Sequence, residues 1–270
     1  MAAKLATGKE LLPNEFSGGE ETNAFLRRLG FDGLPPERRS IQQNLERILS
    51  RYTSARSSEP IGKEHEVWGI FEDLHEEFSE LQAVESEPTL KVSWSAGQGV
   101  WAKVPWIAFL DSRETTTTQN GVYCLILFRQ DASGVCLTFN QGVTDPHDRL
   151  GAREGRKLLH ENANEIQKRA AELSPNGFRL DDEIDVRADP GLGAEYATST
   201  IAYKLYEKGQ VPADKEIEAD LAVFFQLTMT IFNCGRERVE HLDILGEPRI
   251  LRHSRSDTSP ERTNVARLAI

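Results

Sequence analysis

The chain has 270 residues, a net charge of −11 at neutral pH, and 39% hydrophobic against 28% charged residues. This length suits one large domain or two small ones, and the acidic balance argues against a general polyanion binder. No segment approaches the roughly 18 apolar residues that a membrane-spanning helix needs. Without a signal-peptide core, and with three cysteines too scattered for a disulfide framework, a cytoplasmic protein is expected.

The N-terminal third predicts an irregular segment followed by two helices. Residues 1–36 show little periodicity, and we expect a partly ordered extension there. Apolar residues spaced by three and four predict helices over 38–52 and 63–84. The serine-rich stretch 54–61 between them predicts a linker.

The pattern then changes to an alternation of period two and to short apolar runs, both of which are typical of strands. It predicts strands over residues 89–95, 106–110, 122–128 and 135–139. The dipeptide Asn120-Gly121 is a strong turn signal between two of them. The block 89–142 is therefore predicted to form a compact, mainly antiparallel sheet that carries little net charge, with four basic and three acidic side chains.

The remainder of the chain predicts further helices and strands around this sheet. The expected elements are a helix over 156–173, an edge strand over 183–187, a strand over 199–206 and a helix over 214–234. We expect an α+β fold, with a central mixed or antiparallel sheet flanked by helices. Residues 37–250 would form a single domain, and residues 251–270 a basic tail or linker.

Common catalytic motifs are missing from the sequence. It contains no P-loop, no Gly-x-Ser-x-Gly elbow and no His-Glu-x-x-His. Glu183, Asp185 and Arg187 could be matched to a nuclease pattern, but the outward face of an amphipathic strand explains them better. His147 lies between acidic residues without a nearby nucleophile, which favours a loop. We expect no enzymatic activity, no metal and no cofactor.

An aromatic cluster is the most informative feature of the chain. Three of the four tryptophans, Trp94, Trp101 and Trp106, fall close together, and Gly97-Gln98-Gly99 lies between the first two. Tryptophan supplies a large apolar surface, and glycine permits tight turns and close approach. The combination predicts a flexible tip beside an aromatic-lined cleft, for which a nucleobase is the leading candidate ligand.

Strand pairing would extend this cleft. If 106–110 pairs with 122–128, Trp106, Tyr123 and Leu127 could line one pocket, because Tyr123 and Leu127 share a strand face. The alternative is that all three side chains are ordinary core and that the glycines form an ordinary hairpin turn.

These residues resemble the N-terminal DNA-recognition domain of McrB-like, modification-dependent type IV restriction systems. The resemblance follows four ordered segments: LKVSWSxGxG from Leu90, VPWIAFL from Val104, NGVYxxIL from Asn120 and LxFNQG from Leu137. Weaker similarity extends over residues 38–235.

The resemblance implies a domain that binds double-stranded DNA carrying a modified base, typically methylated cytosine, and flips that base into a pocket. The pocket positions fall on Trp106, Tyr123, Leu127 and Tyr196. The DNA-contacting loop falls on Gly97, Gln98, Gly99, Trp101 and Lys103. Gln98 stands where the best-known member has an aromatic residue that enters the duplex, and Leu127 is expected to set the pocket size.

The resemblance also implies a division of labour. A reader of this kind would be fused to, or partnered with, a nuclease or an AAA+ motor that performs cleavage. Two alternatives stay open: an RNA- or nucleotide-binding module that uses the same pocket, and a non-catalytic protein-interaction domain whose tryptophans are core. Binding that requires a modified base in a duplex separates the first function from the other two.

Overall fold

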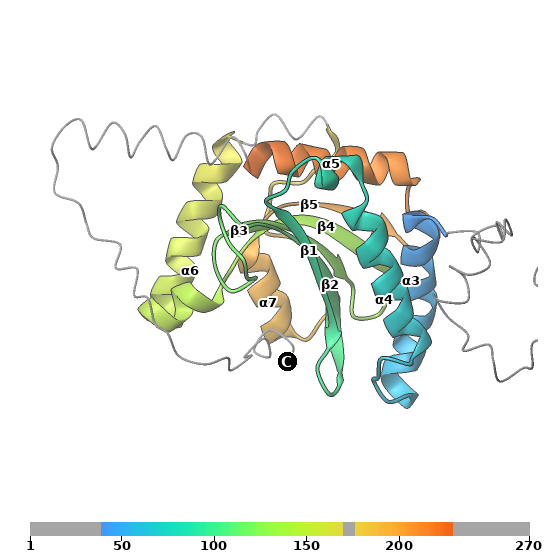
Figure 1. Cartoon of the computed structure of the whole chain (residues 1–270). Helices are drawn as coiled ribbons and strands as arrows, with labels where there is room; N and C mark the ends of the chain where they lie inside the picture. Colours follow the sequence, from blue (N-terminus) through green and yellow to red (C-terminus); the bar gives the residue numbers. More distant parts are fainter. Residues whose placement is uncertain (1–38, 170–175, 229–270) are drawn as a thin grey trace, which may run out of the picture. The chain divides into compact units, whose positions relative to one another are not determined.

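The computed structural model describes residues 39–169 and 176–228. They form the expected α+β fold, in which helices pack on a five-stranded sheet (Figure 1). Neighbouring strands are antiparallel, and their spatial order follows the chain. The strands are β1 (Leu90–Gly97), β2 (Trp101–Asp111), β3 (Val122–Phe128), β4 (Gly134–Gln141) and β5 (Thr200–Glu207).

Five of the six predicted strands are confirmed, but β2 begins at Trp101 instead of residue 106. Its pairing with β3 starts only at Trp106, and of the five residues before it Trp101 pairs with Gly97 of β1. Pro105, which lacks a backbone N–H, lies where the β1–β2 register shifts, a position that tolerates proline. As a result, the β1–β2 hairpin extends beyond the rest of the sheet (Figure 1).

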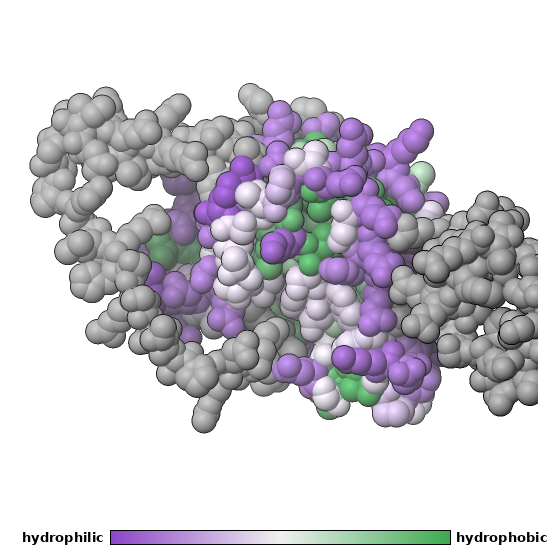
Figure 2. All heavy atoms as spheres, viewed as in Figure 1, coloured by the Kyte–Doolittle hydropathy of each residue, from purple (hydrophilic) through white to green (hydrophobic). Residues whose placement is uncertain are grey.

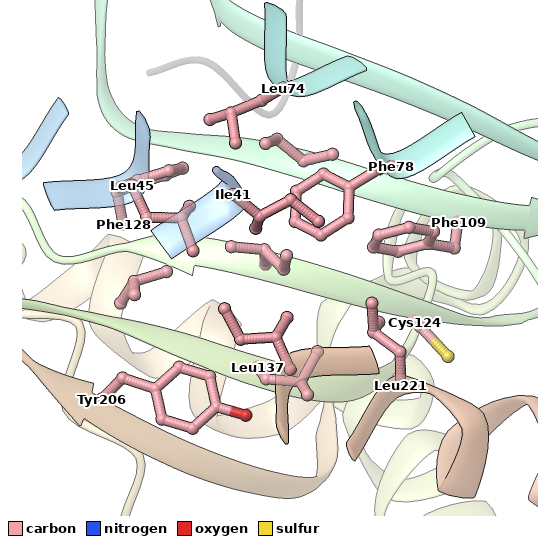
Figure 3. Close-up of a cluster of buried hydrophobic side chains, with 14 of the residues drawn as sticks. Ile41, Leu45, Leu74, Phe78, Phe109, Cys124, Phe128, Leu137, Tyr206 and Leu221 are labelled. Atoms are coloured by element: carbon pink, nitrogen blue, oxygen red, sulfur yellow. The ribbon is translucent and has the colours of Figure 1, made fainter. Parts of the chain in front are cut away.

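One face of the sheet is covered by α3 (Ile41–Ser58), α4 (Glu66–Ser79), α5 (Gln82–Glu85) and a helix over residues 214–228. Figure 3 shows Leu45, Phe78 and Leu221 of these helices meeting the sheet residues Phe109 and Leu137. The described part of the predicted 214–234 helix is thus confirmed, and its apolar stripe faces the core as the spacing indicates.

The predicted linker over 54–61 is wrong, because α3 continues to Ser58. Ala55 is fully buried, which ties this stretch to the core. The hydroxyls of Ser57 and Ser58 donate to the carbonyls of Thr53 and Ser54, so these serines bond back onto the helix. The second predicted helix, 63–84, divides into α4 and α5.

The opposite face of the sheet carries a second apolar cluster under α7 (Pro190–Ser199), a helix that the sequence pattern did not predict. The edge strand predicted over 183–187 is wrong. Ile184 and Val186 are buried as the alternation indicates, but the segment is irregular. A backbone hydrogen bond from Gln130 N to Val186 O joins it to the turn after β3.

Helix α6 (Thr144–Arg169) follows β4 and contacts β5 and α7. It begins well before the predicted residue 156, so the loop expected around His147 is helical, with a kink at Gly151. Predictions for residues 1–36, 170–173 and 229–270 lie outside the described residues. Within the described ranges, no helix combines the length and apolarity needed to cross a membrane.

Two of the three cysteines, Cys124 on β3 and Cys136 on β4, are buried and free. Burial raises the pKa of the Cys136 thiol to about 12 and also raises that of Cys124. Both side chains are therefore neutral and serve as small apolar core residues. Cys234 lies outside the described residues.

Candidate functional site

A cavity lies between α7 and the sheet face formed by β2, β3 and β4. Its walls include Trp106, Tyr123, Leu125, Asn140, Tyr196 and Ser199. The cavity is narrow, with an interior volume of about 20 Å³, which is room for about one water molecule. A planar ring is larger, so its entry requires movement of side chains. Trp106 is partly exposed and is the aromatic wall with the most freedom to move.

Three aromatic side chains reach this cavity from three separate elements. Trp106 comes from β2, Tyr123 from β3 and Tyr196 from α7. The Tyr123 hydroxyl donates to the carbonyl of Thr118 at 2.8 Å, which fixes its ring against the loop before β3. Burial raises the pKa of both tyrosines. Both phenols therefore remain neutral hydrogen-bonding groups around neutral pH.

The structure brings together Trp106, Tyr123 and Tyr196, but Leu127 does not line the cavity. Leu127 is opposite Trp106 in the β2–β3 register and is fully buried in the cluster beneath it. Leu125, two residues earlier on the same face, forms the wall instead. Alternation assigns both leucines to one face, so the sequence could not decide which of them reaches the cavity.

Asn140, on β4, is a polar wall residue that the sequence analysis did not single out. Its side chain is 1% exposed, and its Nδ2 donates to Ser199 Oγ at 3.0 Å. Ser199 Oγ in turn donates to the carbonyl of Tyr196 at 3.0 Å. Asn140 Oδ1 has no hydrogen-bond partner among the described residues. The only sequence signal was the position of Asn140 within the LxFNQG segment.

The rim of the cavity joins α7 to α6 through Glu195, which lines the opening. Its carboxylate lies 3.2 Å from the Arg156 guanidinium and 3.7 Å from His147 Nδ1. Arg153 and Lys157 neighbour Arg156 on α6, and both are exposed. These basic side chains of α6 therefore approach the cavity only through the Arg156–Glu195 ion pair, and the charged residue that lines it is Glu195 itself.

The β1–β2 hairpin turns through two glycines with left-handed backbone. Gly97 has φ 120° and Gly99 has φ 74°. A Cβ on Gly97 would lie 2.0 Å from the carbonyl oxygen of Val100, so only glycine fits there. Gln98 is exposed, and Val100 is 68% exposed, which makes the tip partly apolar. Figure 2 shows apolar atoms at the surface in the lower part of the view, where Figure 1 places the hairpin.

The two remaining residues assigned to the contact loop behave differently. Trp101 is only 8% exposed, and its Nε1 donates to the carbonyl of Glu59 at 2.9 Å. Its ring packs edge-on against Tyr52 in the core, so its side chain is not part of the hairpin surface. Lys103 is exposed and forms an ion pair with Asp189 before α7. Val100, which the sequence analysis did not name, occupies the exposed position instead.

A larger groove of about 430 Å³ lies between α6, α7 and residues 180–182. It is lined by basic side chains such as Arg156 and by acidic ones such as Asp181 and Asp182. This mixture favours no one ligand charge, and among the described residues no Phe, Tyr or Trp lines the groove. The smaller aromatic cavity is therefore the better candidate for a specific site.

The sheet, the extended hairpin and the aromatic-lined cavity under α7 define an α+β domain with a candidate site on one face of the sheet. The chain belongs to the MrcB-like, N-terminal domain family, whose model matches residues 47–232. The family resemblance seen in the sequence is thereby confirmed. A comparison with curated proteins found no match.

Proposed function

We propose that this domain binds double-stranded DNA that carries a modified base, typically methylated cytosine, and receives the flipped base in the cavity under α7. The observation that carries the proposal is the convergence of Trp106, Tyr123 and Tyr196 on one cavity, in a member of the MrcB-like family. Flipping costs a few kcal/mol, and stacking on aromatic rings returns roughly 1–3 kcal/mol per base.

The methyl group itself contributes little to this balance. Its burial is worth only about 0.8 kcal/mol, so discrimination needs a close fit as well. Walls from β2, β3, β4 and α7 surround the cavity and could close on the ring from several sides. Trp106 would move aside to admit the ring and then close over it, since it is the partly exposed aromatic wall.

The hairpin supplies the part that enters the duplex. Proteins that unstack DNA commonly insert an apolar side chain between base steps, and Val100 offers one at the exposed tip. Gln98 beside it can hydrogen-bond the base left without a partner. Lys103, at the base of the hairpin, would contact the phosphate backbone. In this arrangement the two glycines shape the loop while Gln98 and Val100 touch the DNA.

We assign this domain the role of a non-catalytic reader in a modification-dependent restriction system. Cleavage would be performed by a nuclease or an AAA+ motor, either fused to this domain or bound to it, in the cytoplasm. The resemblance to McrB-like systems and the family match support this role.

The proposal is tested by gel shifts with matched duplexes that differ at one base only. The panel contains unmodified cytosine, 5-methylcytosine, 5-hydroxymethylcytosine, N4-methylcytosine and N6-methyladenine, with an RNA of the same sequence. We expect one modified duplex to bind at least about tenfold more tightly than the unmodified one, which corresponds to about 1.4 kcal/mol. Preference for RNA, or no nucleic-acid binding, would instead support one of the two alternative functions.

The basic side chains of α6 give a second prediction. Changing Arg153 and Lys157 to glutamate should weaken binding to modified and unmodified duplexes alike, because phosphate contacts carry no sequence information. The slope of log affinity against log salt should fall by about 0.9 for each phosphate that the variant no longer neutralises. Lys168→Glu is the matched control, since this exposed residue lies about three turns beyond Lys157 on α6. Unchanged affinity in the double variant would remove α6 from the interface.

A further inference from the structure

Asn140 offers the cavity a hydrogen-bond acceptor that no group in the described part of the chain uses. The side chain is 1% exposed and lines the cavity, yet its Oδ1 has no partner there. Buried polar atoms in native proteins are almost always hydrogen-bonded, and leaving one unpaired is costly. An unpaired acceptor on the wall of a candidate binding cavity therefore points to a donor on the ligand.

The orientation of the Asn140 amide is set by its neighbour. Ser199 Oγ donates its one hydrogen to the carbonyl of Tyr196 at 3.0 Å. It can therefore only accept from Asn140, and Nδ2 lies 3.0 Å away to donate. The amide nitrogen is thus engaged and the oxygen is left over. Since Ser199 ends α7 and Tyr196 lies in the same helix, α7 both builds the aromatic wall and orients the acceptor.

We infer that Asn140 Oδ1 selects a flipped cytosine by accepting a hydrogen bond from its exocyclic N4 amino group. This inference rests on the proposed function. Cytosine and adenine present an amino donor at this position, whereas thymine and guanine present a carbonyl oxygen. The oxygen of thymine or guanine would face Asn140 Oδ1 with no hydrogen between them. Both kinds of ring are larger than the closed cavity, and the pyrimidine, as the smaller ring, needs the smaller movement of its walls.

Thymine is the competitor that makes this acceptor necessary. It carries a methyl group on C5, as 5-methylcytosine does, so an apolar contact to that methyl cannot separate the two bases. The two bases differ at position 4, where 5-methylcytosine has an amino group and thymine has a carbonyl oxygen. They also differ at the adjoining N3. A reader of 5-methylcytosine therefore needs a group that distinguishes donor from acceptor at this edge, and Asn140 is placed to do so.

The experiment compares two duplexes that differ at one position, 5-methylcytosine opposite guanine and thymine opposite guanine. The mismatched thymine is the easier base to flip, so any preference for 5-methylcytosine arises in the pocket. We expect wild-type protein to prefer 5-methylcytosine. Asn140→Leu, which keeps the size but removes the acceptor, should lower that affinity roughly 10- to 100-fold and remove the preference.

Ser199→Ala gives a second variant in case Asn140→Leu does not fold. It frees the Asn140 amide to rotate and present Nδ2 to thymine. The difference in affinity between the 5-methylcytosine duplex and the thymine duplex should therefore become smaller, while 5-methylcytosine still binds. Thr138→Val is the control, because Thr138 is a buried polar residue of β4 that bonds Leu125 O and does not line the cavity. The Thr138→Val protein should prefer the 5-methylcytosine duplex over the thymine duplex as strongly as wild-type protein does.

The outcomes separate this inference from the proposed function. If wild-type protein binds both duplexes equally, or if both variants keep the full preference, Asn140 does not read the base edge and the proposed function still stands. Selective binding of N6-methyladenine instead of a cytosine mark overturns the choice of a pyrimidine. If no modified duplex in the panel is preferred, the proposed function fails and the inference fails with it.

Discussion

Replacing Trp106 with alanine should remove most of the affinity for the modified duplex while the domain stays folded. The indole forms one wall of the cavity, and its loss removes a stacking interaction worth roughly 1–3 kcal/mol, or about 5- to 150-fold in affinity. Trp106 is only partly buried, so its truncation leaves the main core under α3 and α4 intact. Fluorescence anisotropy would measure the binding, and circular dichroism with thermal melting would measure the fold.

Trp68→Ala is the matched control for this experiment. Trp68 is also a partly buried tryptophan, but it lies on α4 and its ring packs edge-on against Trp94. Trp94 packs against the main core, which lies on the sheet face opposite to the cavity. It should lose some stability and keep its DNA affinity. A folded Trp106→Ala protein that binds like wild type would show that the cavity does not hold the base.

Replacing Gly97 with alanine should distort the β1–β2 hairpin and remove its contribution to DNA binding. The added Cβ would lie 2.0 Å from Val100 O and 2.5 Å from Ala102 N, and both are backbone atoms that cannot move without opening the hairpin. The residue also has φ 120°. We expect a destabilisation of about 1–3 kcal/mol, with faster hydrogen exchange of the hairpin amides and loss of preference for the modified duplex.

Gly99→Ala distinguishes the effect of a steric clash from the effect of an unfavourable φ angle in the same hairpin. Gly99 also has positive φ, but no atom lies within 4 Å of the position that its Cβ would occupy. Its replacement should therefore cost only about 1 kcal/mol through backbone strain, and most of the DNA affinity should remain. Equal losses in the two variants would mean that loop flexibility matters more than the close backbone approach at Gly97.

Local patterns in the chain were sufficient for the strands of the sheet. Period-two alternation and short apolar runs, with Asn120-Gly121 as a turn, identified all five strands of the meander and the strand face that Tyr123 occupies. The ordered motifs also identified the family, which the match over residues 47–232 confirms. These features depend on neighbours within a few residues, so they are visible in a single sequence.

Local patterns failed where distant packing outweighs local preference. The serine-rich end of α3 reads as a linker, yet the burial of Ala55 holds it helical. The alternation at Ile184 and Val186 reads as a strand, yet both side chains belong to the cluster under α7 and the segment is irregular. In both cases apolar burial decided the conformation, because it contributes more than intrinsic propensity.

The order of residues along the chain was enough to indicate which residue types face each side of the sheet and which aromatic side chains were available for a pocket. Packing in three dimensions was needed to establish that Leu125 and not Leu127 reaches the cavity. It also decided that Trp101 is buried in the core while Val100 stays exposed. The hydrogen bond between Asn140 and Ser199 was likewise visible only in the structure. The reason is that α7 joins the site from a position 59 residues after Asn140 along the chain. Alternation specifies a face of a strand, whereas the depth of a side chain and its partner depend on which distant element packs over it.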